Sequence, residues 1–85
     1  MSALHTIHND TALTAALVRS GSDPLLLLED GVYLTSAEGI KGRTVYVLRE
    51  DLVMRGLSEP AGMVVIDMQG FVDLTVKHNP IVAWY

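Results

Sequence analysis

Two neighbouring carboxylates follow the most apolar stretch of the chain. Glu29 and Asp30 come directly after four consecutive leucines, and Gly31 follows them. A pair of carboxylates can act as general acid and general base when the two side chains converge. Adjacent residues at the end of a strand usually diverge, so helix capping by Asp30 and solvent contact by Glu29 are the favoured interpretation.

A second charged group follows another apolar run. Arg49, Glu50 and Asp51 come after the β-branched and aromatic stretch 44–48. If that stretch is a strand parallel to the leucine run, both charged groups lie at the same edge of one sheet. A ligand pocket there is one alternative, and a surface charge cluster or a cluster lining a subunit interface is the favoured one.

The remaining candidates for chemistry are histidines. His5 and His8 are three residues apart across the end of a predicted strand, so their side chains do not converge, and His78 belongs to another element. Histidine is the commonest metal ligand and general base, yet this spacing favours ordinary polar or interface histidines over a metal site.

Several classes of site are excluded by what the sequence lacks. The chain has no cysteine, which rules out disulfides, thiolate metal sites and any thiol or persulfide nucleophile on this chain. It also has no glycine-rich dinucleotide or phosphate loop and no serine nucleophile elbow. We therefore expect no catalytic residue, cofactor or metal on this chain.

The elements that position these groups centre on Leu25–Leu28. Four leucines without polar alternation predict a strand buried on both faces, as in the middle of a parallel sheet with helices on each side. Pro24 precedes the run and Gly31 follows it, which bounds it at strand length. Open α/β sheets place their chemistry at the carboxyl ends of the strands, so the loop after the leucines is the first place to look for function.

The other elements follow from periodicity and turn residues. We predict strands at 3–7, 44–48, 63–66 and 81–85. Helices are predicted from a cap at Asn9 or Asp10 to Gly21, over at most two turns between Val32 and Glu38 with Asp30 as the cap, and from Arg49 to Gly56. Together these elements predict a single domain, 1–85, that is a three-layer α/β/α sandwich around a mostly parallel sheet of about five strands.

The segment 68–78 fits two structures. Its apolar residues alternate as in a strand, but Asp67 can cap a helix on which Phe71, Leu74 and His78 share one face. We choose the helix, because a parallel connection to the last strand requires a crossover.

Composition indicates association with other subunits. The chain has 85 residues, of which 49% are hydrophobic, and its mean hydropathy is +0.32. A chain this short cannot bury so much apolar area alone, so we expect self-association or a partner protein. The net charge is −4 with six scattered basic residues, which argues against direct binding of nucleic acid. No signal peptide or membrane span is visible, and we expect a soluble intracellular protein.

The segment Ile81–Tyr85 has no polar break and contains the only tryptophan. Chain ends are normally exposed, so this apolar end is expected to pack as a strand or dock on a partner. Trp84 and Tyr85 are residue types that anchor interfaces.

The chain also resembles a known family. The matching segments occur in order along nearly the whole sequence, and the last, with its Leu-Thr-Val-Lys-His run, is the most specific. They are Leu4–Thr6, Leu25–Tyr33, Val45–Leu48 with Asp51-Leu52 and Arg55–Leu57, and Gly70–His78 with Ala83-Trp84. In these segments the chain resembles the TusB/DsrH family of sulfur-relay proteins.

The resemblance implies an α/β/α sandwich around a five-stranded parallel sheet, acting in the cytoplasm as the small subunit beside TusC/DsrF-like and TusD/DsrE-like partners. Complexes of the TusBCD type pass persulfide sulfur from a cysteine desulfurase and a TusA-like carrier toward 2-thiolation of the tRNA wobble uridine. Complexes of the DsrEFH type serve sulfur oxidation instead.

The sequence departs from the family in two respects. Some DsrH-type members carry a cysteine in the first helix, near Ala15, whereas this chain has none. The chain is also short after Tyr33 and around Ser58–Gly62. Because the principal sulfur-carrying cysteine belongs to the TusD/DsrE-like subunit, the resemblance implies a non-catalytic subunit here.

Physics and resemblance together predict a structural subunit of a tRNA-thiolation relay. The alternatives are a subunit of a sulfur-oxidation complex and a homo-oligomeric protein that binds small molecules or partners. The candidate positions at strand ends or facing a partner are Glu29, Asp30, Gly31, Arg49, Glu50, Trp84 and Tyr85.

Overall fold

The leucine run forms the central strand of the molecule. In the computed structural model, which describes residues 2–85, β2 (Leu25–Leu27) is the middle strand of a five-stranded sheet of order β4-β3-β2-β1-β5. All three of its leucines are fully buried. A strand without polar alternation is therefore covered on both faces, as predicted.

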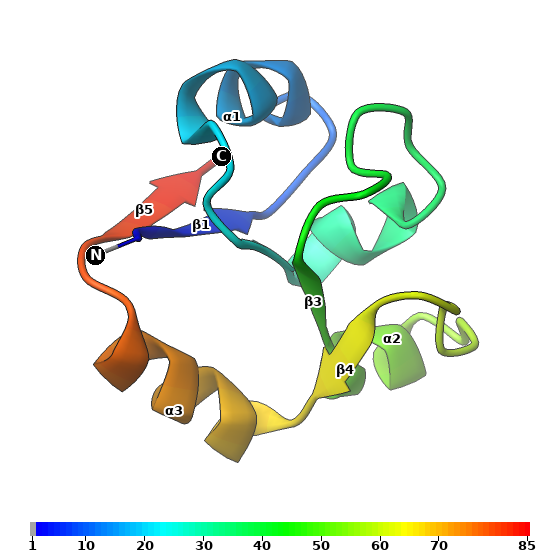
Figure 1. Cartoon of the computed structure of the whole chain (residues 1–85). Coiled ribbons are helices and arrows are strands. Elements are labelled where there is room, and N and C mark those ends of the chain that lie inside the picture. The colour runs from blue at the N-terminus through cyan, green and yellow to red at the C-terminus, as the bar shows by residue number, and fades with distance from the viewer. Residues whose placement is uncertain (1) are drawn as a thin grey trace.

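The other strands are β1 (Leu4–Ile7), β3 (Val45–Leu48), β4 (Val64–Ile66) and β5 (Ile81–Trp84), and all four neighbouring pairs are parallel. The connections are α1 (Leu13–Ser20), the 3₁₀ helix η1 (Glu29–Leu34), α2 (Arg49–Met54) and α3 (Met68–Lys77). Figure 1 shows α1 and α3 on opposite sides of the sheet, which confirms the three-layer α/β/α prediction. No helix within residues 2–85 is long and apolar enough to cross a membrane.

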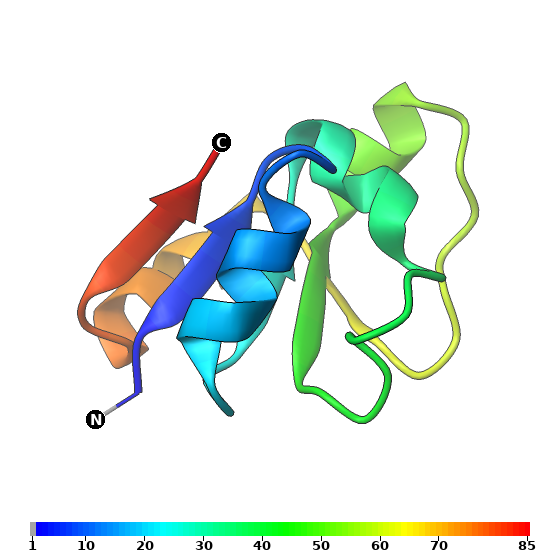
Figure 2. The ribbon, with the colours of Figure 1, turned by 90° about the horizontal axis from the view of Figure 1, so that it is seen from above.

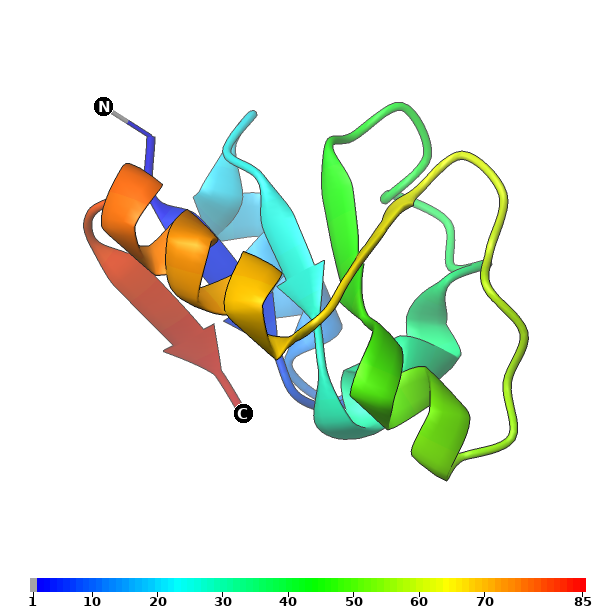
Figure 3. The same ribbon diagram turned by 90° about the horizontal axis from the view of Figure 1, so that it is seen from below.

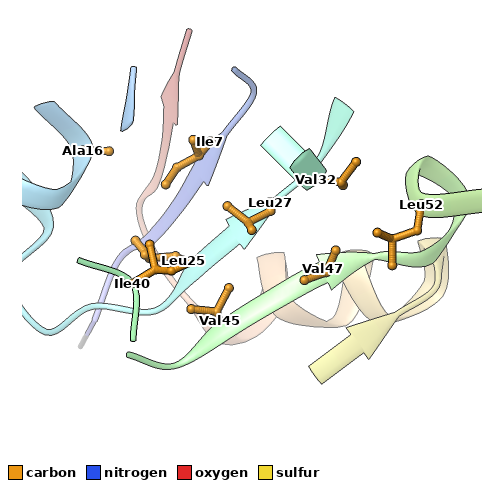
Figure 4. Close-up of a cluster of buried hydrophobic side chains, with 9 residues drawn as sticks. All are labelled: Ile7, Ala16, Leu25, Leu27, Val32, Ile40, Val45, Val47 and Leu52. Carbon is orange, nitrogen blue, oxygen red and sulfur yellow. The ribbon is translucent and has the colours of Figure 1, made fainter. Parts of the chain in front are cut away.

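One face of the sheet carries the larger core. The strand residues of this core meet Ala16 of α1, Val32 of η1 and Leu52 of α2, and they are Ile7, Leu25, Leu27, Val45 and Val47 (Figure 4). Each of these three short connections therefore buries at least one apolar residue on this side.

The opposite face is covered by α3 alone, which runs diagonally across the sheet (Figure 3). Its Leu74 packs on Leu4, Leu26 and Leu48. One helix cannot cover five strands, and Val64 of β4 and Ile81 of β5 consequently stay 53% and 40% exposed. The apolar excess seen in the composition thus lies partly on this face.

The ambiguous segment is a helix. Asp67 caps α3 by accepting the Gly70 N–H through Oδ1 at 2.8 Å. Leu74 is buried and Phe71 packs beside it, so the predicted helical face is the one that meets the sheet. The valines that suggested a strand, Val72 and Val76, point away from the core.

Two capping predictions were wrong. The N-cap of α1 is Ala12, because the Asn9 side chain accepts the Ala12 N–H within the preceding turn and the Asp10 carbonyl accepts the Leu13 N–H. Asp30 does not cap a helix beginning at Val32. The 3₁₀ helix starts earlier, at Glu29, and Arg55 binds the Asp30 carboxylate instead.

Gly31 is required by a close approach of two backbones. A Cβ at this position would lie 2.0 Å from the carbonyl oxygen of Ile7, at the end of β1. That oxygen also accepts the Leu28 N–H. The first turn of η1 therefore fits against β1 only when residue 31 has no side chain.

We predict that Gly31→Ala lowers the free energy of unfolding by about 3 kcal/mol or more, because the backbone contact cannot relax by a rotamer change. Gly56→Ala is the matched control. Gly56 has φ +67° and nothing within 4 Å of a built Cβ, so that change should cost only the backbone strain of about 1–2 kcal/mol. Chemical denaturation of both variants gives the comparison, and equal losses would contradict this explanation of Gly31.

Candidate functional site

Polar side chains from four strands meet at one edge of the sheet. Because all strands are parallel, their carboxyl ends share this edge, as the arrowheads in Figure 2 show for β1 and β5. His8 follows β1, Glu29 and Asp30 follow β2, Arg49 and Glu50 follow β3, and Tyr85 follows β5. The structure thus brings most of the predicted positions to one edge, where they divide into separate groups.

The first group centres on His8. Its Nδ1 contacts Glu29 Oε1, and its Nε2 lies 3.0 Å from Thr6 Oγ1. The ring of Tyr85 stacks on the imidazole with the centroids 4.3 Å apart. The sequence did not predict the contact between His8 and Glu29, because it depends on which strands are neighbours in the sheet.

A hydroxyl, an imidazole and a carboxylate are therefore connected in the order of a nucleophilic triad. The hydroxyl belongs to Thr6, which is only 3% exposed in the middle of β1. Glu29 is exposed and the His8 side chain is partly buried, whereas Thr6 lines none of the four hollows described for residues 2–85, which lie beside η1, α2 and the loops that follow them. The arrangement is therefore suited to fixing the β1 end rather than to attacking a substrate.

Glu29 itself has a strained backbone. Its φ is +53°, the left-handed region that non-glycine residues seldom adopt. Its N–H donates to Asp51 Oδ2 at 2.7 Å while its carboxylate contacts His8. Because both ends are held, the turn from β2 into η1 is tied to α2 on one side and to β1 on the other.

The second group centres on Arg55. Its Nε and Nη2 both donate to Asp30 Oδ1, at 3.1 and 2.9 Å, and its Nη1 lies 3.5 Å from Asp51 Oδ1. The guanidinium also lies 6.0 Å from the centre of the Tyr33 ring. The hydrogen bond with Asp30 and the charges of both carboxylates raise the pKa of Arg55 above its ordinary value. Asp30 thus joins η1 to α2, and the two carboxylates 29 and 30 have different partners.

Arg49 and Glu50 lie apart from both groups. Arg49 Nε donates to Glu59 Oε2 at 3.2 Å, and Glu50 Oε2 accepts the Met68 N–H at 3.0 Å at the start of α3. Both line an open hollow of about 460 Å³ with Val53, Met54 and Asp67. The sequence left a ligand pocket, a surface charge cluster and a cluster lining an interface as alternatives for this region. The structure shows surface charges around a hollow with mostly apolar walls.

Trp84 takes part in a partly buried series of hydrogen bonds that passes through His5. Its Nε1–H donates to His5 Nδ1 at 3.0 Å, and His5 Nε2 lies 3.0 Å from Asp23 Oδ2. An imidazole that accepts at Nδ1 carries its proton at Nε2 when neutral, so Nε2 donates to Asp23. These two hydrogen bonds connect β5, β1 and the turn before β2. The alternation of residues 3–7 could have indicated that His5 is buried, but its two partners depend on strand order.

Potential metal ligands do not gather. Within residues 2–85, no three His, Asp or Glu side chains are arranged to hold a metal ion. Many of the polar groups at this edge bind one another, and Val53 and Met54 at the hollow beside α2 are apolar side chains that remain open to solvent.

The sequence matches known proteins along most of its length. Residues 7–81 match the family model described as DsrH like protein. Protein TusB from Escherichia coli O139:H28 (strain E24377A / ETEC), from Escherichia coli (strain K12 / DH10B) and from Shigella boydii serotype 18 (strain CDC 3083-94 / BS512) are each 44% identical to this chain over 95 residues. Each alignment covers 95% of this chain and 99% of the relative. The alignments exceed the 85 residues of this chain, so the relatives contain residues that it lacks.

We predict that Trp84→Phe destabilises the fold by about 1–3 kcal/mol, because it leaves the buried Nδ1 of His5 without a donor. Tyr85→Phe is the control. Tyr85 is 75% exposed and its ring keeps the stack on His8, so the midpoint of thermal unfolding should not move. A Trp84→Phe variant as stable as Tyr85→Phe would show that the indole hydrogen bond contributes nothing.

Proposed function

Because this chain belongs to the DsrH family, it is a TusB-type sulfur-relay subunit, and we propose that it supports persulfide transfer toward 2-thiolation of the tRNA wobble uridine without carrying sulfur itself. The observation that carries the proposal is a match to TusB along 95% of a chain that has no cysteine. All the relatives named above are TusB proteins, which favours tRNA thiolation over sulfur oxidation.

The chemistry of sulfur transfer supports a non-catalytic role. A persulfide forms on a thiolate, and this chain has none. The Thr6 hydroxyl beside His8 is buried and cannot substitute for it. The transferred sulfur therefore stays on cysteines of other subunits, and this chain contributes shape and contacts.

In this proposal the partners are TusC-like and TusD-like subunits, with a TusA-like carrier acting indirectly, and the complex works in the cytoplasm as the family resemblance implies. Direct contact with the tRNA is not part of the role, because the few basic side chains are scattered and Arg43, Arg49 and Arg55 are bound to groups of this chain.

The hollow beside α2 is the surface that we assign to a partner subunit. Val53 and Met54 are 71% and 79% exposed. Glu50 and Asp67 line the hollow beside them, together with Arg49, whose charge is already paired with Glu59. Apolar side chains within a charged rim are typical of a specific interface. The occupant that fits is a partner segment with an apolar side chain flanked by Lys or Arg, whereas a second copy of this hollow would bring carboxylates together.

We expect this chain to restore 2-thiouridine in a bacterial strain that lacks its own TusB. Mass spectrometry of digested tRNA measures the modified nucleoside, with an empty vector as the negative control and the strain's own TusB as the positive control. Failure to restore the nucleoside while the chain is present and bound to the TusC- and TusD-like proteins would contradict the proposed function.

We expect Val53→Asp to weaken binding to the TusC- and TusD-like subunits at least about tenfold, because a charge replaces an apolar contact beside existing carboxylates. Val18→Asp on α1 is the matched control, since Val18 is 75% exposed on another helix. Calorimetric titration of each variant with the co-expressed partners measures the affinities. Equal affinities for the two variants would show that Val53 of α2 does not contact the partner subunits.

A further inference from the structure

Among residues 2–85, no strand lies beside the outer edge of β5. β5 is the last strand in the sheet order and pairs only with β1, and no other element lies along its outer side in Figures 1 and 2. The Leu4 N–H donates to the Pro80 carbonyl and the His8 N–H to the Trp84 carbonyl, so residues 80 and 84 face β1. By the alternation of a strand, the peptide groups of Ile81, Ala83 and Tyr85 face outward.

This edge lacks the features that usually prevent pairing. Edge strands are commonly protected by charged side chains, proline or a covering segment. No charged residue or proline occurs from Ile81 to Tyr85. The opposite edge strand, β4, has three residues and is followed at once by Asp67. The β5 edge is therefore the one that is open to another strand.

We propose that β5 pairs with β5 of a second copy of this chain, antiparallel about a two-fold axis at Ala83. In this register Ala83 exchanges two backbone hydrogen bonds with Ala83 of the second copy. Ile81 and Tyr85 of the second copy form the next outward-facing pair, and the same pair recurs on the other side of the axis. The five-stranded sheets of two copies become one continuous sheet.

The sequence of β5 is complementary to its own reverse. Around the axis, Ile81 lies opposite Tyr85 of the second copy on one face, and Val82 lies opposite Trp84 of the second copy on the other. Aromatic residues opposite β-branched residues are among the favourable cross-strand pairs. The smallest side chain, Ala83, lies at the axis, where each copy meets itself. No like charges are brought together, which is what favours a second copy as the occupant.

Apolar surface next to β5 enlarges the contact. A Cβ on Gly70 would lie 2.9 Å from Ile66 Cβ, so this flank of α3 faces β4. Val72 follows by about 200° around the helix and therefore lies on the flank toward β5. Val72 and Ile81 are 48% and 40% exposed. A specific dimer needs about 500 Å² from each copy, about a tenth of the 4,891 Å² surface of this chain.

The pairing is independent of the proposed function, because it uses β5 rather than the hollow beside α2. Its test needs only the purified full-length chain without partners. A failure here therefore leaves the relay assignment untouched, and a failure to restore 2-thiouridine leaves this pairing untouched.

Sedimentation equilibrium should give twice the 9.3 kDa mass of the chain at high micromolar concentration. Ala83→Lys places two charges together at the axis, and Ala83→Pro removes the outward N–H without removing a bond to β1. Each should raise the dimer dissociation constant at least about tenfold. Val18→Lys, on the exposed surface of α1, is the control that should dimerise like the original chain.

Amide hydrogen exchange tests the same register without any substitution. In the dimer the Ala83 N–H is hydrogen-bonded, so its exchange should slow as the protein concentration rises. A chain that remains monomeric, a dimer that both Ala83 variants retain, or an Ala83 amide whose exchange does not depend on concentration would each overturn the proposal.

Discussion

The burial of β2 on both faces is the constraint on which the rest of the structure depends. A strand of leucines has to lie between two helical layers, and short parallel connections then place the carboxyl ends of its neighbours at one edge. Glu29 and Asp30 stand at the end of this strand, and they bind His8 at the end of β1 and Arg55 behind α2. The gathering of these polar side chains at one edge of the sheet thus follows from the burial of the leucine strand at its centre.

Much of the fold could be predicted from local pattern. The leucine run, the alternation around β1 and the acidic start of α2 each determine one element through neighbours in the sequence. The helix 68–77 followed from the need for a crossover more than from its own ambiguous pattern. The errors at Asn9, Asp10 and Asp30 have one physical cause, because a carboxylate or amide can satisfy several nearby donors and the tertiary partner decides which.

The partners at the edge could not be predicted in the same way. Whether Arg55 reaches Asp30, or Trp84 reaches His5, depends on strand order and on how far each helix extends past the sheet. The residue types nevertheless set limits that the structure respects: the chain has no cysteine, the Thr6 hydroxyl is buried, and the polar groups of this edge bind one another. In the function that we propose, such a subunit acts through the proteins that it binds.

The most direct measurement follows radioactive sulfur through a relay reconstituted from this chain, its TusC- and TusD-like partners, a TusA-like carrier and a cysteine desulfurase. The label should appear on the cysteine-containing subunits and never on this chain, and omission of this chain should reduce the label that reaches its partners. Label bound to this chain, or transfer that proceeds equally well without it, would contradict the account.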